Sequence, residues 1–430
     1  MQISRSSSPA RGRAKRHPAC PLAACALALL ISDASLRGAD SSWNVGTPIV
    51  TYWAGPPMTD SVARQMKEGG WNLVWCAEKE LDVAQRHGLR AQLTDALLSP
   101  KSLETPAERE KLDALVARVR SHPALYAYFL TDEPNASQFP ALGKLVAYLR
   151  ERDPGHLAYI NLFPTYATNE QLGNQGDTVT AYRAHLHQYV EIVKPALISY
   201  DHYQFAVEGD TENYFLNLSL IRRAALDAGL PFLNIVQACT WTPSMRVPTG
   251  DEMRYLIYTT LAYGAQGISY YVYCHPGHTG GIALADGTPT PLYEAVKSLN
   301  LQFVAIASQL QGLRSIGVYH EGVQPPGTDP LPEDATFRLF DPPSDRTPPR
   351  PGKGVAMGLF GPQAAPGAAQ ATHIVLVNLD YRAAATVGLS APAPFEVLDA
   401  IGSGTWMPTG ATRGELRIER GGGRLVRVQP

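Results

Sequence analysis

The feature that most constrains the fold is a repeated alternation of strands and helices. Between Pro48 and about Leu313, short apolar runs and longer helical patterns follow one another eight times. The runs are rich in β-branched and aromatic residues, which is typical of parallel strands buried on both faces. Eight such units predict an α/β fold, a parallel sheet closed into a (β/α)8 TIM barrel. The predicted strands are Ile49–Trp53, Leu73–Cys76, Arg90–Leu93, Leu125–Leu130, Ala158–Phe163, Leu197–Tyr200, Phe232–Val236 and Gly267–Tyr273. An open doubly wound sheet stays an alternative, although no glycine-rich phosphate turn follows the first strand.

The pattern changes after Leu313. Helical periodicity disappears, and alternating apolar runs appear, punctuated by Gly, Pro and Asp. This pattern predicts a small antiparallel β-sandwich after the barrel. Its predicted strands are Thr336–Phe340, Val355–Leu359, His373–Leu379, Thr386–Leu389, Phe395–Leu398, Glu415–Glu419 and Arg424–Val428. We therefore divide the chain into a leader (1–39), a barrel (45–313) and a sandwich domain (314–430).

The leader has the order of a secretory signal. A basic stretch precedes an apolar run, Ala19–Ile31, and the small-residue site Ser32-Asp33-Ala34 follows it. Basic, apolar and small residues in this order predict export to the periplasm or the extracellular space. Lipoprotein anchoring is an alternative, because Leu22–Cys25 resembles a lipobox, and a disordered basic tail is another. No later run is long enough to cross a membrane, so we expect no membrane span in the mature chain.

Charge and cysteine content exclude several classes of protein. Charged residues make up 18% of the chain and its net charge is −2, so no basic stripe for nucleic acid is present. Outside the leader, the cysteines are Cys76, Cys239 and Cys274, without metal-binding spacing. We expect buried free thiols, with a Cys239–Cys274 bridge as the alternative. No cofactor and no metal site is predicted, and the sequence leaves the oligomeric state open.

Reactive side chains follow the predicted strands at their carboxyl ends, where barrel enzymes place their active sites. They are carboxylates, amides and aromatic rings, the groups that bind sugar hydroxyls and stack on sugar rings. A phosphate cradle, a Ser–His pair and a cysteine nucleophile are all missing. The predicted partner is therefore an oligosaccharide or polysaccharide. The candidate catalytic residues are Glu133, Asp201 and Asp132, and the candidate substrate-binding residues are Trp53, Trp75, Asp95, Asn161, Tyr200, His202, Tyr203, Gln237, Trp241, Tyr273 and His275.

Glycoside hydrolysis needs two carboxyl groups on either side of the scissile bond. The proton donor must be neutral at working pH, so its pKa must be raised. Glu133 meets this need, because it follows an aromatic strand and adjoins Asp132, and both apolar surroundings and a neighbouring negative charge raise the pKa of a carboxyl group. The alternative is that Asp132 and Glu133 cap the next helix. For the second carboxylate we choose Asp201, with Asp95 and then Glu78 as the other candidates.

The fourth strand carries a family resemblance. Asp132-Glu133-Pro134 resembles the Asn-Glu-Pro motif of clan A glycoside hydrolases, which include bacterial β-galactosidase-like enzymes. The resemblance implies a barrel hydrolase with Glu133 as acid/base and a C-terminal β-domain. The chain departs from that clan because its seventh strand, from Asn234 to Cys239, has no acid where the clan's nucleophile lies.

Two other functions remain open. Adjacent Asp132 and Glu133 are similar to the pair in hexosaminidase-type barrels, where the acetamido group of the substrate is the nucleophile. Tyr200-Asp201 is also similar to the Tyr-Asp of chitinase-type barrels. The missing acid on the seventh strand, in contrast, favours a barrel that binds a glycan without cleaving it.

Overall fold

The computed structural model describes residues 43–341 and 353–428. The leader predicted for residues 1–39 lies outside these residues. Within them, none of the helices combines the length and the apolar character that crossing a membrane requires.

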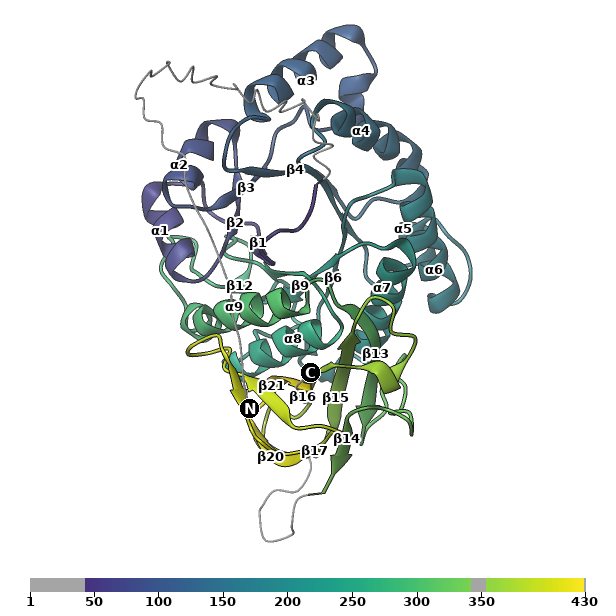
Figure 1. Ribbon diagram of the computed structural model, residues 1–430. Coiled ribbons are helices and arrows are strands. Elements are labelled where there is room, and N and C mark those ends of the chain that lie inside the picture. Colours follow the sequence, from purple (N-terminus) through teal and green to yellow (C-terminus); the bar gives the residue numbers. More distant parts are fainter. Residues whose placement is uncertain (1–42, 342–352, 429–430) are drawn as a thin grey trace, which may run out of the picture. The chain divides into compact units, whose positions relative to one another are not determined.

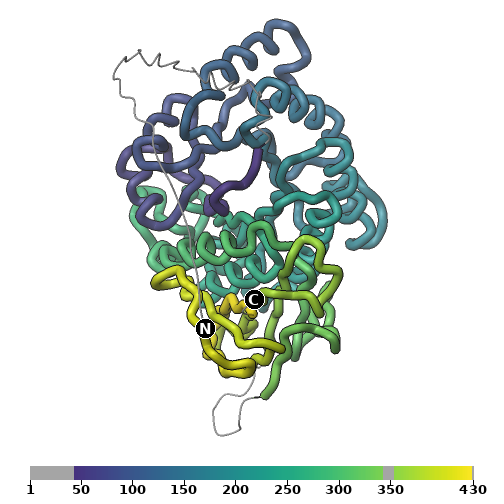
Figure 2. The backbone as a smooth tube through the Cα atoms, viewed as in Figure 1, coloured from purple at the N-terminus to yellow at the C-terminus, as the bar shows by residue number. Residues whose placement is uncertain are grey.

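The first part of the chain is a (β/α)8 barrel (Figure 1). Its strands pair in the order β1-β11-β9-β6-β5-β4-β3-β2, and every pair is parallel. Figure 2 shows the chain passing once around the ring, from purple at its first strand to green at its last. An open doubly wound sheet is therefore excluded. The strands are β1 (Ile49–Trp53), β2 (Leu73–Cys76), β3 (Arg90–Leu93), β4 (Leu125–Asp132), β5 (Leu157–Leu162), β6 (Ile198–His202), β9 (Phe232–Gln237) and β11 (Gly267–Tyr271).

The barrel closes between β1 and β2 through individual hydrogen bonds instead of a continuous ladder. The Val50 amide donates to Asn72 Oδ1 (3.0 Å), and the Asn72 amide donates to the Val50 carbonyl (3.1 Å). Nearer to the carboxyl ends of the two strands, Trp75 Nε1 donates to the Tyr52 carbonyl (2.6 Å). These bonds satisfy the backbone groups that an open edge would leave unpaired.

The helices surround the ring (Figure 1). They are α1 (Asp60–Glu68), α2 (Leu81–Arg86), α3 (Pro106–Val119), α4 (Phe139–Arg152), α5 (Asn169–Leu172), α6 (Thr178–Gln188), α7 (Tyr214–Ala228), α8 (Gly250–Ala262) and α9 (Pro291–Leu310). Short 3-10 helices occupy Glu78–Glu80, Pro100–Leu103, Ala136–Gln138 and Ala368–Gln370, and a π-helical turn, Tyr189–Val193, follows α6. A small hairpin, formed by β7 (Phe205–Ala206) and β8 (Gly209–Asp210), lies in the loop after β6. A second two-stranded antiparallel sheet joins the loops after β9 and β11 and consists of β10 (Cys239–Thr240) and β12 (Thr279–Gly280).

The barrel has two hydrophobic layers. One cluster fills its interior and includes Leu73, Leu157, Leu197 and Leu233. A larger cluster lies between the strands and the helices. Because neighbouring residues of a strand point to opposite faces, each strand supplies both layers. Cys76, Cys239 and Cys274 are buried and free, as predicted.

The last part of the chain forms two antiparallel sheets. One has the order β13-β15-β16-β21-β18-β19 and the other the order β14-β17-β20. Side chains from both sheets, such as Leu359, Leu376 and Leu389, form one core, as expected of a sandwich. The strands are β13 (Arg314–Glu321), β14 (Arg338–Phe340), β15 (Val355–Gly361), β16 (His373–Asn378), β17 (Ala385–Ser390), β18 (Phe395–Leu398), β19 (Trp406–Pro408), β20 (Arg413–Ile418) and β21 (Gly423–Val428). The sequence prediction had missed β13 and β19.

The sandwich packs directly on α8. A Cβ atom added to Gly358 on β15 would lie 2.0 Å from the Ala262 carbonyl, so the contact requires glycine there. A second link joins Tyr381 to the loop after β6, because its hydroxyl donates to both Asp210 carboxylate oxygens (2.8 and 2.9 Å). Residues 41–430 form one compact unit. The boundaries 45–313 and 314–430 therefore stay a prediction.

Candidate active site

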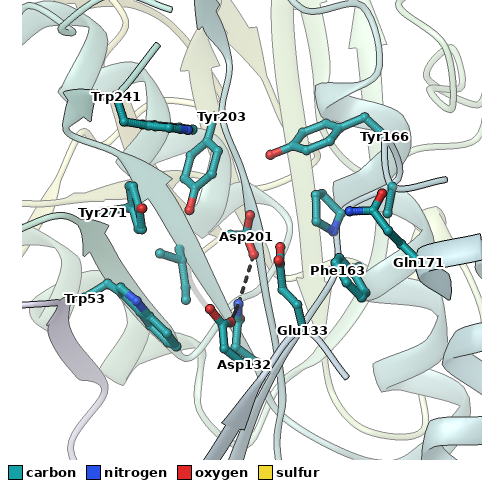
Figure 3. A pocket seen from close by; sticks show the side chains of 14 residues that line it. Trp53, Asp132, Glu133, Phe163, Tyr166, Gln171, Asp201, Tyr203, Trp241 and Tyr271 are labelled. Carbon is teal, nitrogen blue, oxygen red and sulfur yellow. Dashed lines mark hydrogen bonds between the residues drawn. The ribbon is translucent and has the colours of Figure 1, made fainter. Parts of the chain in front are cut away.

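A pocket of about 270 Å³ opens at the carboxyl ends of the barrel strands. It brings together seven of the predicted site residues, which come from strands β1, β4, β5 and β6 and from the loops after β4, β6 and β9. These residues are Trp53, Asp132, Glu133, Asn161, Asp201, Tyr203 and Trp241. Three carboxyl groups therefore share one small cavity, and Figure 3 shows the Glu133 carboxyl pointing toward that of Asp201.

The backbone of β4 explains how adjacent acids both reach the pocket. Successive strand residues normally point to opposite faces. Here the register with β5 shifts between Phe129 and Thr131, which places Asp132 opposite Asn161. The next residue, Glu133, has φ +43°, a left-handed conformation that is costly for a residue with a side chain. A bulge and a strained residue together turn both carboxyls inward, and such strain is concentrated at functional sites.

Asn161 bridges two of the carboxyls. Its Nδ2 donates to Asp132 Oδ1 (3.0 Å) and to Asp201 Oδ1 (2.9 Å). Its Oδ1 accepts a hydrogen bond from Ser199 Oγ (3.0 Å), and Ser199 in turn contacts the Tyr159 hydroxyl (2.7 Å). Both donors of the buried amide are therefore used by the protein. Asn161, predicted as a substrate ligand, lines the pocket, and its side chain also holds two of the carboxyls in place.

The electrostatics of the pocket favour neutral carboxyls. Burial, together with the charge of Asp132, raises the pKa of Glu133 to about 7. Asp201 is only 3% exposed, and burial and the nearby Glu133 carboxyl raise its pKa well above the usual range of an aspartate. Because each charge disfavours the other, Glu133 and Asp201 titrate as a pair that holds one proton over a range of pH.

Aromatic rings form one wall of the pocket. The ring of Tyr203 lies 4.6 Å from that of Trp241 and 5.0 Å from that of Tyr271. Trp53 lies beside them and packs edge-on against Trp75 (5.0 Å). Flat apolar faces of this kind stack on sugar rings while the carboxyls and amides bind hydroxyls.

The loop between β5 and α5 forms the opposite wall. Figure 3 shows Phe163 and Tyr166 of this loop, with Gln171 of α5, on the side facing the aromatic wall. Pro164 and Ala167 of the same loop also line the pocket. The loop is anchored beneath, because Asn217 Oδ1 accepts hydrogen bonds from the Thr165 amide (2.9 Å) and hydroxyl (3.2 Å). The insert therefore has a fixed conformation next to the carboxyls.

Seven predicted residues do not line the pocket. Tyr200 and His202 point toward the helices, and the two ring nitrogens of His202 contact Asn217 and Thr211. Gln237 is buried and binds the Phe205 amide (2.8 Å) and carbonyl, where clan A enzymes have their nucleophile. Two of the other four are aromatic: Trp75 packs against Trp53, and Tyr273 is buried against Tyr52 and Trp71. Asp95 accepts a hydrogen bond from the Leu97 amide, and His275 is exposed.

The prediction missed several pocket residues. Tyr271 and Ile235 are the inward residues of β11 and β9, and the alternation along those strands was the signal that pointed to them. Phe163, Pro164, Tyr166 and Ala167 come from an irregular loop, for which no periodicity exists, and Gln171 comes from the short helix α5. Glu78, the third candidate for the second carboxylate, binds Arg118 on the surface (2.7 Å). Among residues 43–341 and 353–428, no group of His, Cys, Asp and Glu side chains is arranged to hold a metal ion.

No protein-family model and no curated protein matches the sequence. Several solved glycoside hydrolases resemble the structure. A β-galactosidase from Marinomonas ef1 has 12% identity and a TM-score of 0.45, with 63% of this chain and 62% of that chain covered. A β-galactosidase from Halorubrum lacusprofundi has 10% identity and a TM-score of 0.46, with 88% and 99% covered. Xylanase 10B from Thermotoga maritima has 11% identity and a TM-score of 0.40, with 60% and 96% covered.

These neighbours are glycoside hydrolases of different specificities. The chain spans less than two thirds of the Marinomonas enzyme. A similarity at this level concerns architecture, so the reaction must be argued from the pocket.

Proposed function

We propose that the chain is a glycoside hydrolase in which Glu133 is the proton donor and Asp201 is the second carboxylate. One observation carries this proposal: Asp132, Glu133 and Asp201 converge in one pocket between aromatic walls. The pKa of Glu133, about 7, is that of a general acid that is still protonated near neutral pH.

In the proposed reaction, neutral Glu133 donates its proton to the glycosidic oxygen while the leaving group departs. Ionised Asp201 attacks the anomeric carbon and forms a glycosyl ester. Water, activated by ionised Glu133, then hydrolyses that ester and restores both groups. The pair holds one proton, and the proposed starting state has that proton on Glu133 and the negative charge on Asp201.

The proximity of the two carboxyls favours retention of the anomeric configuration. Inverting enzymes hold their carboxyls roughly 6.5 to 9.5 Å apart to admit a water molecule, whereas retaining enzymes hold them about 5 to 5.5 Å apart. Here the Glu133 and Asp201 carboxyls line the same small pocket, near enough for each to influence the pKa of the other, which favours the shorter separation. The bridge through Asn161 supports the same assignment, because it fixes Asp201 and stabilises its charged form.

A second mechanism is favoured by one specific observation. The pKa of Asp201 is raised well above its usual range, and a protonated carboxyl is no nucleophile. In a substrate-assisted hydrolysis of N-acetylhexosaminides, the acetamido oxygen would attack in its place, with Asp132 orienting it and Glu133 as donor. Tyr200 lies outside the pocket, so the chitinase-like part of this alternative has no support from position.

The substrate is proposed to be an extracellular oligosaccharide or polysaccharide. The aromatic walls and the carboxyl floor support a sugar, and the signal-like leader supports export to the periplasm or beyond.

The test is hydrolysis of aryl glycosides and natural oligosaccharides by wild type, Glu133→Gln and Asp201→Asn. Both variants should lose about 10² to 10⁴ in rate on the substrate that wild type cleaves. Asp95→Asn is the matched control, because Asp95 follows β3 but does not line the pocket. Full activity of Asp201→Asn on N-acetylhexosaminides alone would select the substrate-assisted mechanism. Binding without any cleavage by wild type would instead identify a glycan-binding barrel.

A further inference from the structure

The pocket contains no positive charge. Fourteen described residues line it, three of them are acidic, and none is Lys, Arg or His. The nearest imidazoles do not supply a cation. His202 is buried with both ring nitrogens bound, and His278 contacts the Tyr271 hydroxyl behind the aromatic wall (3.0 Å). Burial lowers the pKa of both histidines, and for His278 the neighbouring His275 adds to that effect.

An anionic ligand would therefore find no compensating cation among the residues that line the pocket. Proteins that bind carboxylate or sulfate groups place Arg or Lys against them, because the charge must be paired when water is removed. Two of the three pocket carboxyls, those of Asp132 and Asp201, accept hydrogen bonds from the Asn161 amide, and none of the three is paired with a cation of the pocket lining. A second anion brought into the same cavity would be repelled, and like charges placed together at an interface weaken binding strongly.

The pocket is also small. Its volume of about 270 Å³ lies just below the roughly 300 to 1,000 Å³ of typical small-molecule sites. The aromatic wall closes one side, and the anchored loop with Tyr166 and Gln171 closes the other. This leaves room for one sugar ring above the carboxyls.

We propose that the pocket takes a single terminal sugar residue that carries no anionic group, and that it rejects uronic acids and sulfated sugars. The substrate class is thus an uncharged chain end, removed one residue at a time. The release of that residue rests on the proposed function, whereas the selection against anions rests on the composition of the pocket and holds for binding alone.

The test uses matched ligand pairs that differ by one charge. Calorimetry on the full chain measures binding of both anomers of p-nitrophenyl glucoside and galactoside, each beside its uronide. We use Glu133→Gln as well as wild type, so that turnover does not consume the ligand. At least one neutral member should bind, and its uronide should bind at least about 30-fold more weakly. A uronide that binds within 3-fold of its neutral partner would overturn the proposal, and so would a set in which no member binds.

A designed cation gives an independent readout. Gln171 is exposed on the pocket wall, and its Oε1 accepts from the Thr168 amide (2.9 Å). Gln171→Lys should raise the ratio of uronide affinity to neutral-sugar affinity about tenfold or more. Gln171→Met removes the same hydrogen bond without adding charge and should not gain uronide binding. Equal uronide affinity in the folded Lys and Met variants would contradict the electrostatic argument.

Hydrolysis separates the two proposals. A uronide cleaved as fast as its neutral partner refutes the selectivity while the hydrolase assignment stands. A neutral sugar that binds but is not cleaved refutes the hydrolase assignment while the selectivity stands. For chain-end action, an oligosaccharide of the cleaved sugar should release monosaccharide from the first time points. Early internal cuts would refute that part.

Discussion

Replacing Glu133 by Gln should make the protein more stable at alkaline pH, although it removes the proposed proton donor. The carboxyl has a pKa of about 7 in the folded protein, compared with 4.5 for an ordinary glutamate. The folded chain therefore holds more protons than the unfolded chain between these values, and its stability falls as the pH rises through them. This difference in pKa corresponds to about 3 kcal/mol of lost folding stability when Glu133 is ionised. Contact of the half-buried carboxyl with water reduces this to about 1 to 3 kcal/mol.

Urea unfolding of wild type and Glu133→Gln at pH 4 and pH 8 measures this effect. The amide keeps the size of the side chain and the left-handed backbone, so it changes only the charge. The two proteins should be about equally stable at pH 4, and the variant should gain about 1 to 3 kcal/mol at pH 8. Glu110→Gln, on the exposed face of α3, is the control and should change stability by no more than about 0.5 kcal/mol at either pH. A stability difference that does not vary with pH, or a loss at pH 8, would refute this account of the pocket.

Two further predictions follow from other contacts. Asn161→Ala removes a hydrogen-bond donor that stabilises the ionised form of Asp201. The acidic limb of the pH profile of kcat/KM should therefore move up by about one to two pH units. An unchanged limb would show that Asp201 need not be ionised. Arg246→Met leaves Glu252, whose side chain is 5% exposed, without its salt bridge of 2.6 Å, and should cost about 3 to 5 kcal/mol at pH 7. Burial opposes ionisation of Glu252, but Arg246 and Thr249 hold its pKa below the usual value. The contribution of this pair is therefore present above about pH 4.5 and lost as the pH falls, so thermal unfolding at pH 3 should show a smaller cost than at pH 7.

The barrel and its acids could be predicted from the sequence for a physical reason. Strands buried on both faces need continuous apolar runs, and the carboxyl end of each run is where barrel side chains meet. Glu133 and Asp201 were found this way without any knowledge of distance. The rule that residues at the carboxyl end of a strand belong to the site also selected Tyr200 and His202, which do not line the pocket. Successive strand residues point to opposite faces, so the neighbours of the inward Asp201 must point outward.

Register and loop conformation could not be predicted. The inward turn of both Asp132 and Glu133 depends on the bulge after Phe129 and on a positive φ, and no local pattern indicates either. Gln237 lies in the expected strand position, yet its amide serves the backbone of Phe205. Gln171 reaches the pocket only because the loop before α5 folds back over it.

The most direct test of Glu133 as proton donor compares leaving groups on the sugar that wild type cleaves. A 2,4-dinitrophenyl group leaves without protonation, whereas an alkyl alcohol needs a proton from the enzyme. Glu133→Gln should lose about 10² to 10⁴ in kcat/KM on the alkyl glycoside and much less on the dinitrophenyl glycoside. An equal loss on both substrates, or no loss on either, would contradict the central claim that Glu133 protonates the departing oxygen.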